Sequence, residues 1–176
     1  MTDRSRLNVF EEEQRFRQKW LWALLLGLAA IEIGVFGGGA YQQLVLGKPW
    51  GDKPMSDTGM LITAVSVSVG MLGMLCLFRA MRLTTRLDDR QLELHLFPFK
   101  RRIVLLGDIE RFEARAYNPI RDYGGWGIKY GGKEKGWVYN ISGDRGVFLE
   151  LRDGQRLMVG SQRAEELAEK LKGVKG

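Results

Sequence analysis

The sequence has few of the residues that most often build catalytic or metal centres. Its 176 residues include one cysteine, Cys76, and one histidine, His95. A single cysteine excludes both an intrachain disulfide and a cysteine-rich zinc site. No cysteine or acidic cluster lies near His95 in the sequence, which argues against a histidine metal site or histidine-based catalysis. We therefore expect no catalytic residue, no metal and no cofactor.

Nucleotide-binding patterns are also missing. The glycines within residues 124–132 are not followed by a Lys-Ser/Thr pair, and no dinucleotide-binding spacing precedes a helix. The formal net charge of +6 would suit nucleic-acid binding, but the chain has no recognition helix and no RNA-binding aromatic pair. The sequence predicts a protein that is not an enzyme and does not bind nucleic acid.

Two long apolar segments, residues 20–46 and 58–78, occupy much of the first half of the chain. Each exceeds the roughly 20 residues that a helix needs to cross a hydrocarbon core. Their single charged side chain is Glu32, which would be a protonated or hydrogen-bonded packing site or, alternatively, part of an ion pathway. The sequence predicts a two-helix transmembrane hairpin with residues 47–57 as its external loop.

The distribution of cations predicts the orientation of this hairpin. Arginines and lysines flank it on both sides: Arg4, Arg6, Arg15, Arg17 and Lys19 before it, and Arg79, Arg82, Arg86 and Arg90 after it. In the loop, two lysines are balanced by two aspartates. Because positive residues stay on the cytoplasmic side, we expect a multi-pass protein of the inner cell membrane with residues 1–19 and 79–176 cytoplasmic.

Small residues recur at four-residue spacing in both apolar segments. Gly34 and Gly38 form one such pair, and Ser66 and Gly70 the other. Pairs of this kind let helix backbones approach closely. They would pack the hairpin together or bring two protomers into contact, or they reflect the general frequency of glycine in membrane helices.

The remainder, residues 79–176, has the length and pattern of one small β domain. Leu92, Leu94 and Leu96 alternate with polar residues, as in a half-buried strand. Later, two strands flank the turn Asp153-Gly154, and helical periodicity begins after Ser161. We expect roughly seven antiparallel strands in a small barrel or sandwich, followed by one C-terminal helix.

Several short motifs resemble bacterial pleckstrin-homology-like (PH-like) domains, in particular a subgroup of membrane-anchored members. The resemblance covers residues 83–172. It is carried by Leu87-Asp88-Asp89, Arg102-Ile103-Val104-Leu105 with Asp108-Ile109, Arg121-Asp122-Tyr123-Gly124-Gly125-Trp126-Gly127-Ile128, Gly136-Trp137-Val138-Tyr139-Asn140 and Ser142-Gly143. It implies a mostly-β PH-like barrel sealed at one end by the helix, and a binding or assembly module, sometimes ring-forming, more than an enzyme.

Two candidate surfaces follow. The glycine-rich stretch between residues 117 and 146 carries aromatic side chains that would bind a protein if exposed, or fill the barrel if buried: Tyr123, Trp126, Tyr130, Trp137 and Tyr139. Cations that would contact anionic lipid headgroups are Arg79, Arg82, Arg86, Arg90, Lys100, Arg101 and Arg102.

Two functions are therefore open from the sequence. The first is a membrane-anchored, non-catalytic module for protein interaction or self-assembly, with a membrane protein or a second copy as partner. The alternative is recognition of anionic lipid headgroups at the inner membrane surface.

Overall fold

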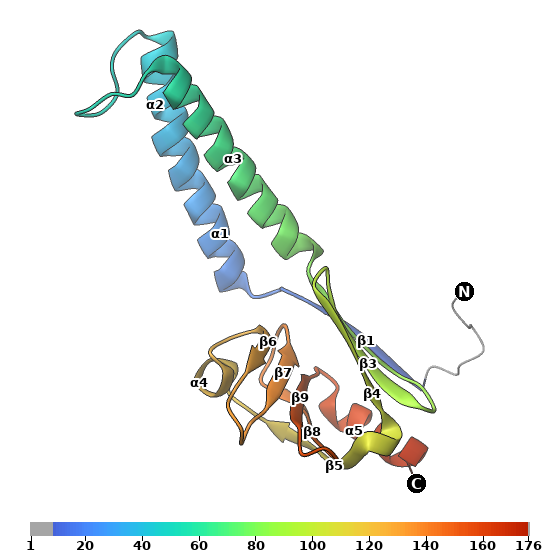
Figure 1. Cartoon of the computed structure of the whole chain (residues 1–176). Helices are drawn as coiled ribbons and strands as arrows, with labels where there is room; N and C mark the ends of the chain where they lie inside the picture. Colours follow the sequence, from blue (N-terminus) through green and yellow to red (C-terminus); the bar gives the residue numbers. More distant parts are fainter. Residues whose placement is uncertain (1–8, 176) are drawn as a thin grey trace. The chain divides into compact units, whose positions relative to one another are not determined.

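The structure is a computed structural model that describes residues 9–175. The chain separates into two compact units, drawn in Figure 1. We call residues 17–79 the hairpin unit, and residues 9–16 together with 80–175 the β unit. Arg4 and Arg6, which contributed to the predicted orientation, lie outside the described residues.

The hairpin unit consists of two long helices. The first comprises α1 (Lys19–Glu32), the π-helical segments η1 (Ile33–Gly37) and η2 (Tyr41–Val45), and α2 (Gly38–Ala40) between them; the second is α3 (Asp57–Ala80). Both helices are long and apolar enough to cross a membrane. The two predicted apolar segments are thus helical, with ends within two residues of the predicted bounds.

Polar side chains within the hairpin unit bond across its two helices. Ser68 Oγ donates a 2.7 Å hydrogen bond to the buried carboxylate of Glu32. At the loop end, Gln43 Nε2 donates to the Met55 carbonyl at 2.8 Å and to Asp57 Oδ1 at 2.9 Å. The Ser68 bond gives Glu32 the partner that a carboxyl group among apolar residues requires, which supports its interpretation as a packing site.

The small-residue pairs do not join the two helices of one chain. A Cβ added at Gly34, Gly38 or Gly70 would meet no atom within 4 Å, and Ser66 is exposed on the hairpin. The prediction that these pairs pack the hairpin together is therefore wrong. Contact between protomers at these positions stays a prediction.

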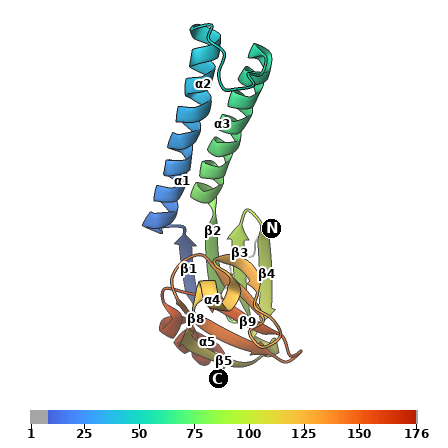
Figure 2. The same ribbon diagram turned by 90° about the vertical axis from the view of Figure 1, so that its left-hand side faces the viewer.

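The β unit contains nine strands in two sheets. The four-stranded sheet has the order β1 (Phe10–Arg15), β2 (Arg82–Leu87), β3 (Gln91–Phe97), β4 (Lys100–Leu105). The five-stranded sheet has the order β5 (Ile109–Ala116), β8 (Arg145–Leu151), β9 (Arg156–Gly160), β7 (Trp137–Asn140), β6 (Gly127–Tyr130). Two short helices, η3 (Leu106–Asp108) and α4 (Pro119–Tyr123), and the C-terminal helix α5 (Ala164–Lys175) complete the unit; α4 and α5 are labelled in Figure 2.

This arrangement confirms a mostly-β domain with a C-terminal helix and differs from the predicted barrel. The described strands form two separate sheets, and β7 pairs with β9 in parallel. The predicted alternation is confirmed, because leucines and valines of both sheets and of α5 are buried between the layers: Leu83, Leu87, Leu92, Leu94, Leu96, Val104, Val147, Leu149, Leu157, Val159, Leu167 and Leu171.

Strand β1 was not predicted. Its six residues lie in the segment expected to be a plain cytoplasmic tail, and three consecutive glutamates hide its alternation. In the sheet, Phe10, Glu12 and Gln14 point inward and are buried, while Glu11 and Glu13 point outward. The strand that precedes the hairpin is therefore part of the same domain as the strands that follow it.

Polar bonds hold β1 to the junction between β9 and α5. The Glu12 carboxylate accepts hydrogen bonds from Ser161 Oγ and, at 2.8 Å, from the Gln162 backbone N–H. Gln14 Nε2 donates to the Gly160 carbonyl at 2.8 Å. Because both side chains are almost completely buried, these partners replace the water that the side chains lose on folding.

We expect Glu12→Ala to lower the free energy of unfolding by about 3 kcal/mol, because it removes two hydrogen bonds to a buried carboxylate and leaves the buried Ser161 hydroxyl without this acceptor. The thermal midpoint of the detergent-solubilised full chain should fall by about 10 °C or more. Glu13→Ala is the matched control: the exposed Glu13 forms surface ion pairs with Arg15 and Arg82, so the midpoint of this variant should stay close to that of the wild type. Equal effects of the two substitutions would contradict the role assigned to Glu12.

Candidate functional site

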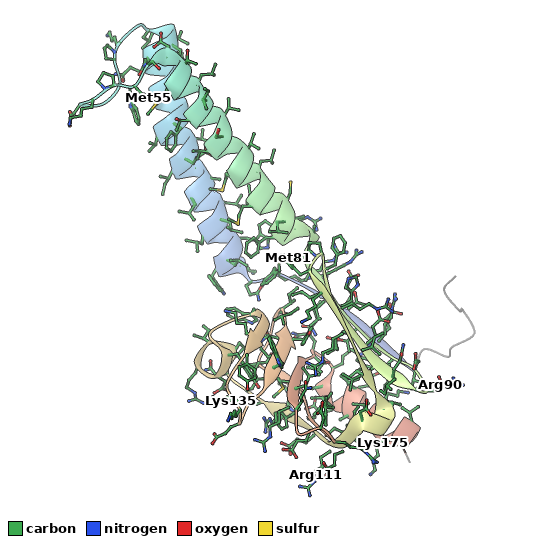
Figure 3. All side chains as sticks on the ribbon, in the orientation of Figure 1. Met55, Met81, Arg90, Arg111, Lys135 and Lys175 are labelled. Atoms are coloured by element: carbon green, nitrogen blue, oxygen red, sulfur yellow. The ribbon has the colours of Figure 1, made fainter. Side chains whose placement is uncertain are left out.

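Both chain connections to the hairpin unit leave the four-stranded sheet at the same end. Strand β1 ends at Arg15, which lies opposite Arg82, the first residue of β2. Residues 16–18 separate β1 from α1, and Met81 alone separates α3 from β2. Ala80 and Arg82 are therefore at most about 7 Å apart between Cα atoms. We call this the connected end. Met81, which precedes β2, and Arg90, in the turn between β2 and β3, are labelled in Figure 3.

The turn between β3 and β4 lies at the connected end. Arg82 is the register partner of Phe97, and the chain turns through Pro98 and Phe99 before β4 begins at Lys100. The Phe99 backbone N–H donates to the Leu96 carbonyl at 2.8 Å, which closes the turn. Phe97 is 38% exposed and Phe99 61% exposed. Large aromatic side chains therefore face outward at this end.

Cations surround these aromatic rings. The Arg82 guanidinium carbon lies 5.2 Å from the centroid of the Phe97 ring, and Lys100 Nζ lies 5.7 Å from a ring centroid of Trp137. Such distances are those of cation–π contacts. Trp137 packs against Tyr130 with ring centroids 5.4 Å apart, and both side chains are exposed.

We call this surface the rim and define it by Arg82, Phe97, Phe99, Lys100, Arg101, Tyr130 and Trp137. It combines residues from both predicted surfaces, which the Lys100–Trp137 contact brings together across the two sheets. Exposed rings flanked by cations are complementary to a binding partner whose surface has an apolar region bordered by anionic groups.

The remaining predicted lipid-contacting cations are dispersed. Arg86 pairs with Glu11 at 2.8 Å one residue before β2 ends, far from the connected end, and Arg90 lies at the end opposite the connected end. Arg102 lies on the inner side of β4 and donates to Gln155 at 2.8 Å. Arg79 belongs to the last turn of α3 in the hairpin unit. The collar predicted from sequence is therefore reduced to Arg82, Lys100 and Arg101 in the β unit.

The predicted aromatic surface is also divided. Tyr123 and Tyr139 are buried, Trp126 is half-buried, and only Tyr130 and Trp137 are exposed. From sequence these rings could be exposed or could fill the domain, and the structure contains both cases.

The Tyr123 ring covers the outer face of the five-stranded sheet, whereas Tyr139 lies on the opposite face, in register with Val159. Tyr123 packs with Val138, Phe148 and Met158, and Tyr117 packs against this cluster. A Cβ at Gly131 would lie 2.8 Å from the Tyr123 ring, so the glycine lets the chain pass closely over it. This second small core explains why the stretch is rich in both glycine and aromatic residues.

Helix α4 brings Tyr123 onto the sheet. Asn118 Oδ1 caps the helix by accepting from the Ile120 and Arg121 backbone N–H groups, and Pro119 occupies its first position. Gly124 ends it in the left-handed region, with φ of 71°. The Tyr123 hydroxyl donates to the Lys135 carbonyl at 3.1 Å, and burial raises the pKa of Tyr123. These cap residues were present in the sequence and could have predicted this one-turn helix.

Among the described residues, no three His, Cys, Asp or Glu side chains lie close enough together to hold a metal ion. His95 lies half-buried beside Phe97, with ring centroids 6.2 Å apart. Next to the rim, an open depression of about 350 Å³ is lined by Tyr130, Trp137 and neighbouring polar residues of the β8–β9 turn. The rim can therefore bind a partner through exposed aromatic rings and cations at its surface.

Comparison of the chain with protein-family models, with curated proteins and with solved structures returned no match. The resemblance to PH-like domains stays a prediction.

The second core can be tested by titration. Tyr117 accepts a 3.0 Å hydrogen bond from Asn140 Nδ2, and burial raises its pKa from 10.0 to about 12. Between pH 10 and 12 the folded chain therefore holds a proton that the unfolded chain has lost, so stability falls as pH rises through this window. We expect Tyr117→Phe to flatten this decline in denaturant midpoint while losing about 1 kcal/mol at neutral pH. An unchanged slope between pH 10 and 12 would show that Tyr117 is not buried in this way.

Proposed function

We propose that this protein is a membrane-anchored, non-catalytic module whose β unit binds the surface of the bilayer that holds its hairpin, with the rim recognising anionic headgroups. One observation carries the proposal: the end of the sheet that receives both chain connections also presents Phe97, Phe99 and the three cations. The chain connections hold this end within a few residues of the helices.

The chemistry of the rim supports this function. Aromatic side chains are favoured at the boundary between hydrocarbon and water, where their rings leave bulk water without entering the apolar interior. Each cation near an anionic membrane surface contributes about 1 kcal/mol. Covalent attachment to the hairpin raises the effective concentration of the rim at the membrane surface, so a few weak contacts suffice.

The proposal includes the orientation. Strands β1 and β2 flank the hairpin and pair along their whole length, which supports an even number of crossings with both ends of the chain on one side. Arg15, Arg17 and Lys19 before the hairpin and Arg79 and Arg82 after it support the cytoplasmic side of the inner cell membrane.

A module for protein interaction or self-assembly, the first expectation from sequence, is the second candidate function. The burial of Tyr123 and Tyr139 reduces the predicted aromatic surface to Tyr130 and Trp137. A different feature favours assembly: β4 is an edge strand of its sheet and exposes Ile103 and Leu105.

Membrane contact by the rim can be measured with a dye that reports polarity. The label would be placed at Phe99→Cys in a Cys76→Ser background, and the full chain reconstituted into vesicles of phosphatidylcholine with or without phosphatidylglycerol. We expect the label at 99 to show a blue-shifted emission and quenching by spin-labelled lipids, both stronger when phosphatidylglycerol is present.

The matched control places the label at Asp89→Cys, an exposed position at the opposite end of the sheet. Its emission should not respond to phosphatidylglycerol. Adding Lys100→Glu and Arg101→Glu to the chain labelled at 99 should abolish the lipid-dependent shift because it reverses two of the attracting charges. Identical behaviour of labels at 99 and 89 would refute membrane contact by the rim.

The orientation has its own test in sealed inner-membrane vesicles and intact cells. In the same cysteine-free background, Asp52→Cys in the loop and Asp153→Cys in the β unit would react with a membrane-impermeant thiol reagent. We expect reaction of residue 52 only from outside the cell and of residue 153 only from the cytoplasmic side. Reaction of both residues from one side would exclude a spanning hairpin.

A further inference from the structure

Strand β4 leaves one edge of the four-stranded sheet open. Within the described strands its hydrogen-bonded neighbour is β3, and the other edge of the sheet is β1. Ile103 and Leu105 on the outer face of β4 are 48% and 52% exposed. An edge strand with exposed aliphatic side chains is a template for another strand unless something protects it.

The two edges carry opposite charges. Strand β4 begins with Lys100, Arg101 and Arg102 and has no acidic residue, whereas β1 contains three consecutive glutamates. Of these, Glu11 and Glu13 point outward. Charges of this sign oppose pairing of β4 with itself and favour pairing of β4 with β1 of another copy.

The strand directions agree with this choice. The four strands alternate in direction, so β1 and β4 run opposite to each other. When two copies stand side by side in the same orientation, β4 of one therefore meets β1 of the next in the antiparallel sense. Antiparallel pairing of two β4 strands would instead put the two connected ends at opposite ends of the joined sheet, which is unfavourable for chains anchored in one membrane.

The register within the sheet also determines which residues would meet. Two rows of register partners cross the outer face of the sheet from β1 to β4. The first row is Glu13, Thr84, His95 and Arg101; the second is Glu11, Arg86, Glu93 and Ile103. Continuing the rows into the next copy places Arg101 opposite its Glu13 and Ile103 opposite its Glu11. On the inner side, the same continuation places Arg102 opposite Glu12.

The backbone groups match in this register. The Glu11 carbonyl faces the open edge of β1, because it accepts from Arg163 Nη1 at 3.2 Å rather than from β2. In antiparallel sheets the groups alternate, so Glu13 also directs its N–H and C=O to the edge. Followed through the registers of the sheet, the same alternation directs the backbone N–H and C=O groups of Arg101 and Ile103 to the open edge of β4.

We infer that copies of this chain join β4 to β1 of the next copy, giving a continuous antiparallel sheet with Arg101 paired to Glu13 of its neighbour. Because the contact is heterologous, it repeats into an open row or a ring instead of stopping at a dimer. On pairing, Arg101 would leave its ion pair with Glu93 of the same copy and pair with Glu13 of the neighbour. Arg163 would release its hydrogen bond to the Glu11 carbonyl, which then accepts from β4. The inference does not require lipid recognition by the rim, although Arg101 belongs to both surfaces.

Disulfide crosslinking tests the register directly. The full chain with Cys76→Ser, Glu13→Cys and Arg101→Cys would be oxidised mildly in its own membranes and run on a non-reducing gel. Facing residues of an antiparallel pair have Cα atoms about 5.5 Å apart, within disulfide range. Within one copy residues 13 and 101 lie three strands apart, about 14 Å, so an intrachain bond is excluded. We expect a ladder of trimers and larger multimers.

Two controls make the result specific. The pair Asp89→Cys with Arg101→Cys is equally exposed and out of register, and it should give no ladder. In the wild-type background, Arg101→Glu should weaken association by placing like charges opposite each other, and Glu13→Arg added to it should restore association. Chemical crosslinking through lysines measures this, with thermal unfolding to verify that each variant is folded.

The outcomes separate the two proposals. A ladder in membranes with and without anionic lipid supports edge pairing whatever the rim does. Crosslinking that stops at dimers, an equal ladder from the out-of-register pair, or a charge exchange that fails to restore association in folded protein overturns the inference.

Discussion

The pairing of β1 with β2 is the constraint on which the rest of the β unit depends. These strands are neighbours in the sheet, yet the whole hairpin unit lies between them in the chain. The domain is therefore complete only when both ends of the hairpin are on the same side of whatever the hairpin crosses. Glu12 also joins β1 to the junction between β9 and α5, where its buried carboxylate accepts hydrogen bonds from Ser161 and Gln162.

The same constraint explains the position of the rim. Once β1 and β2 leave the sheet at one end, the alternating strand directions bring the β3–β4 turn to that end as well. Phe97 and Phe99 are exposed there, among cations, while the leucines of β3 are buried in the core. The proposed membrane contact uses the end of the sheet and the proposed pairing of copies uses its edges; Arg101, near the start of β4, belongs to both surfaces.

Regular local patterns predicted much of this fold. The alternating leucines of β3, the turn at Asp153-Gly154 and the periodicity of α5 each depend on near neighbours in the sequence, and each is present. Strand β1 was missed because its consecutive glutamates read as a charged tail; burial of Glu12 requires partners about 150 residues away. The parallel pairing of β7 with β9 is equally non-local.

The candidate site was only partly predictable from sequence, because it too depends on contacts between residues far apart in the chain. Residue type alone marked Lys100 and Trp137 as members of two separate surfaces, and the packing of the two sheets brought them together. By itself the sequence determined two apolar helices, a charged β domain and the absence of a cysteine framework, because composition and periodicity are local properties. Tertiary structure decided which aromatic rings are buried, which cations share one end of a sheet, and that the chain before the hairpin belongs to the domain after it, because each of these depends on contacts between residues far apart in the chain.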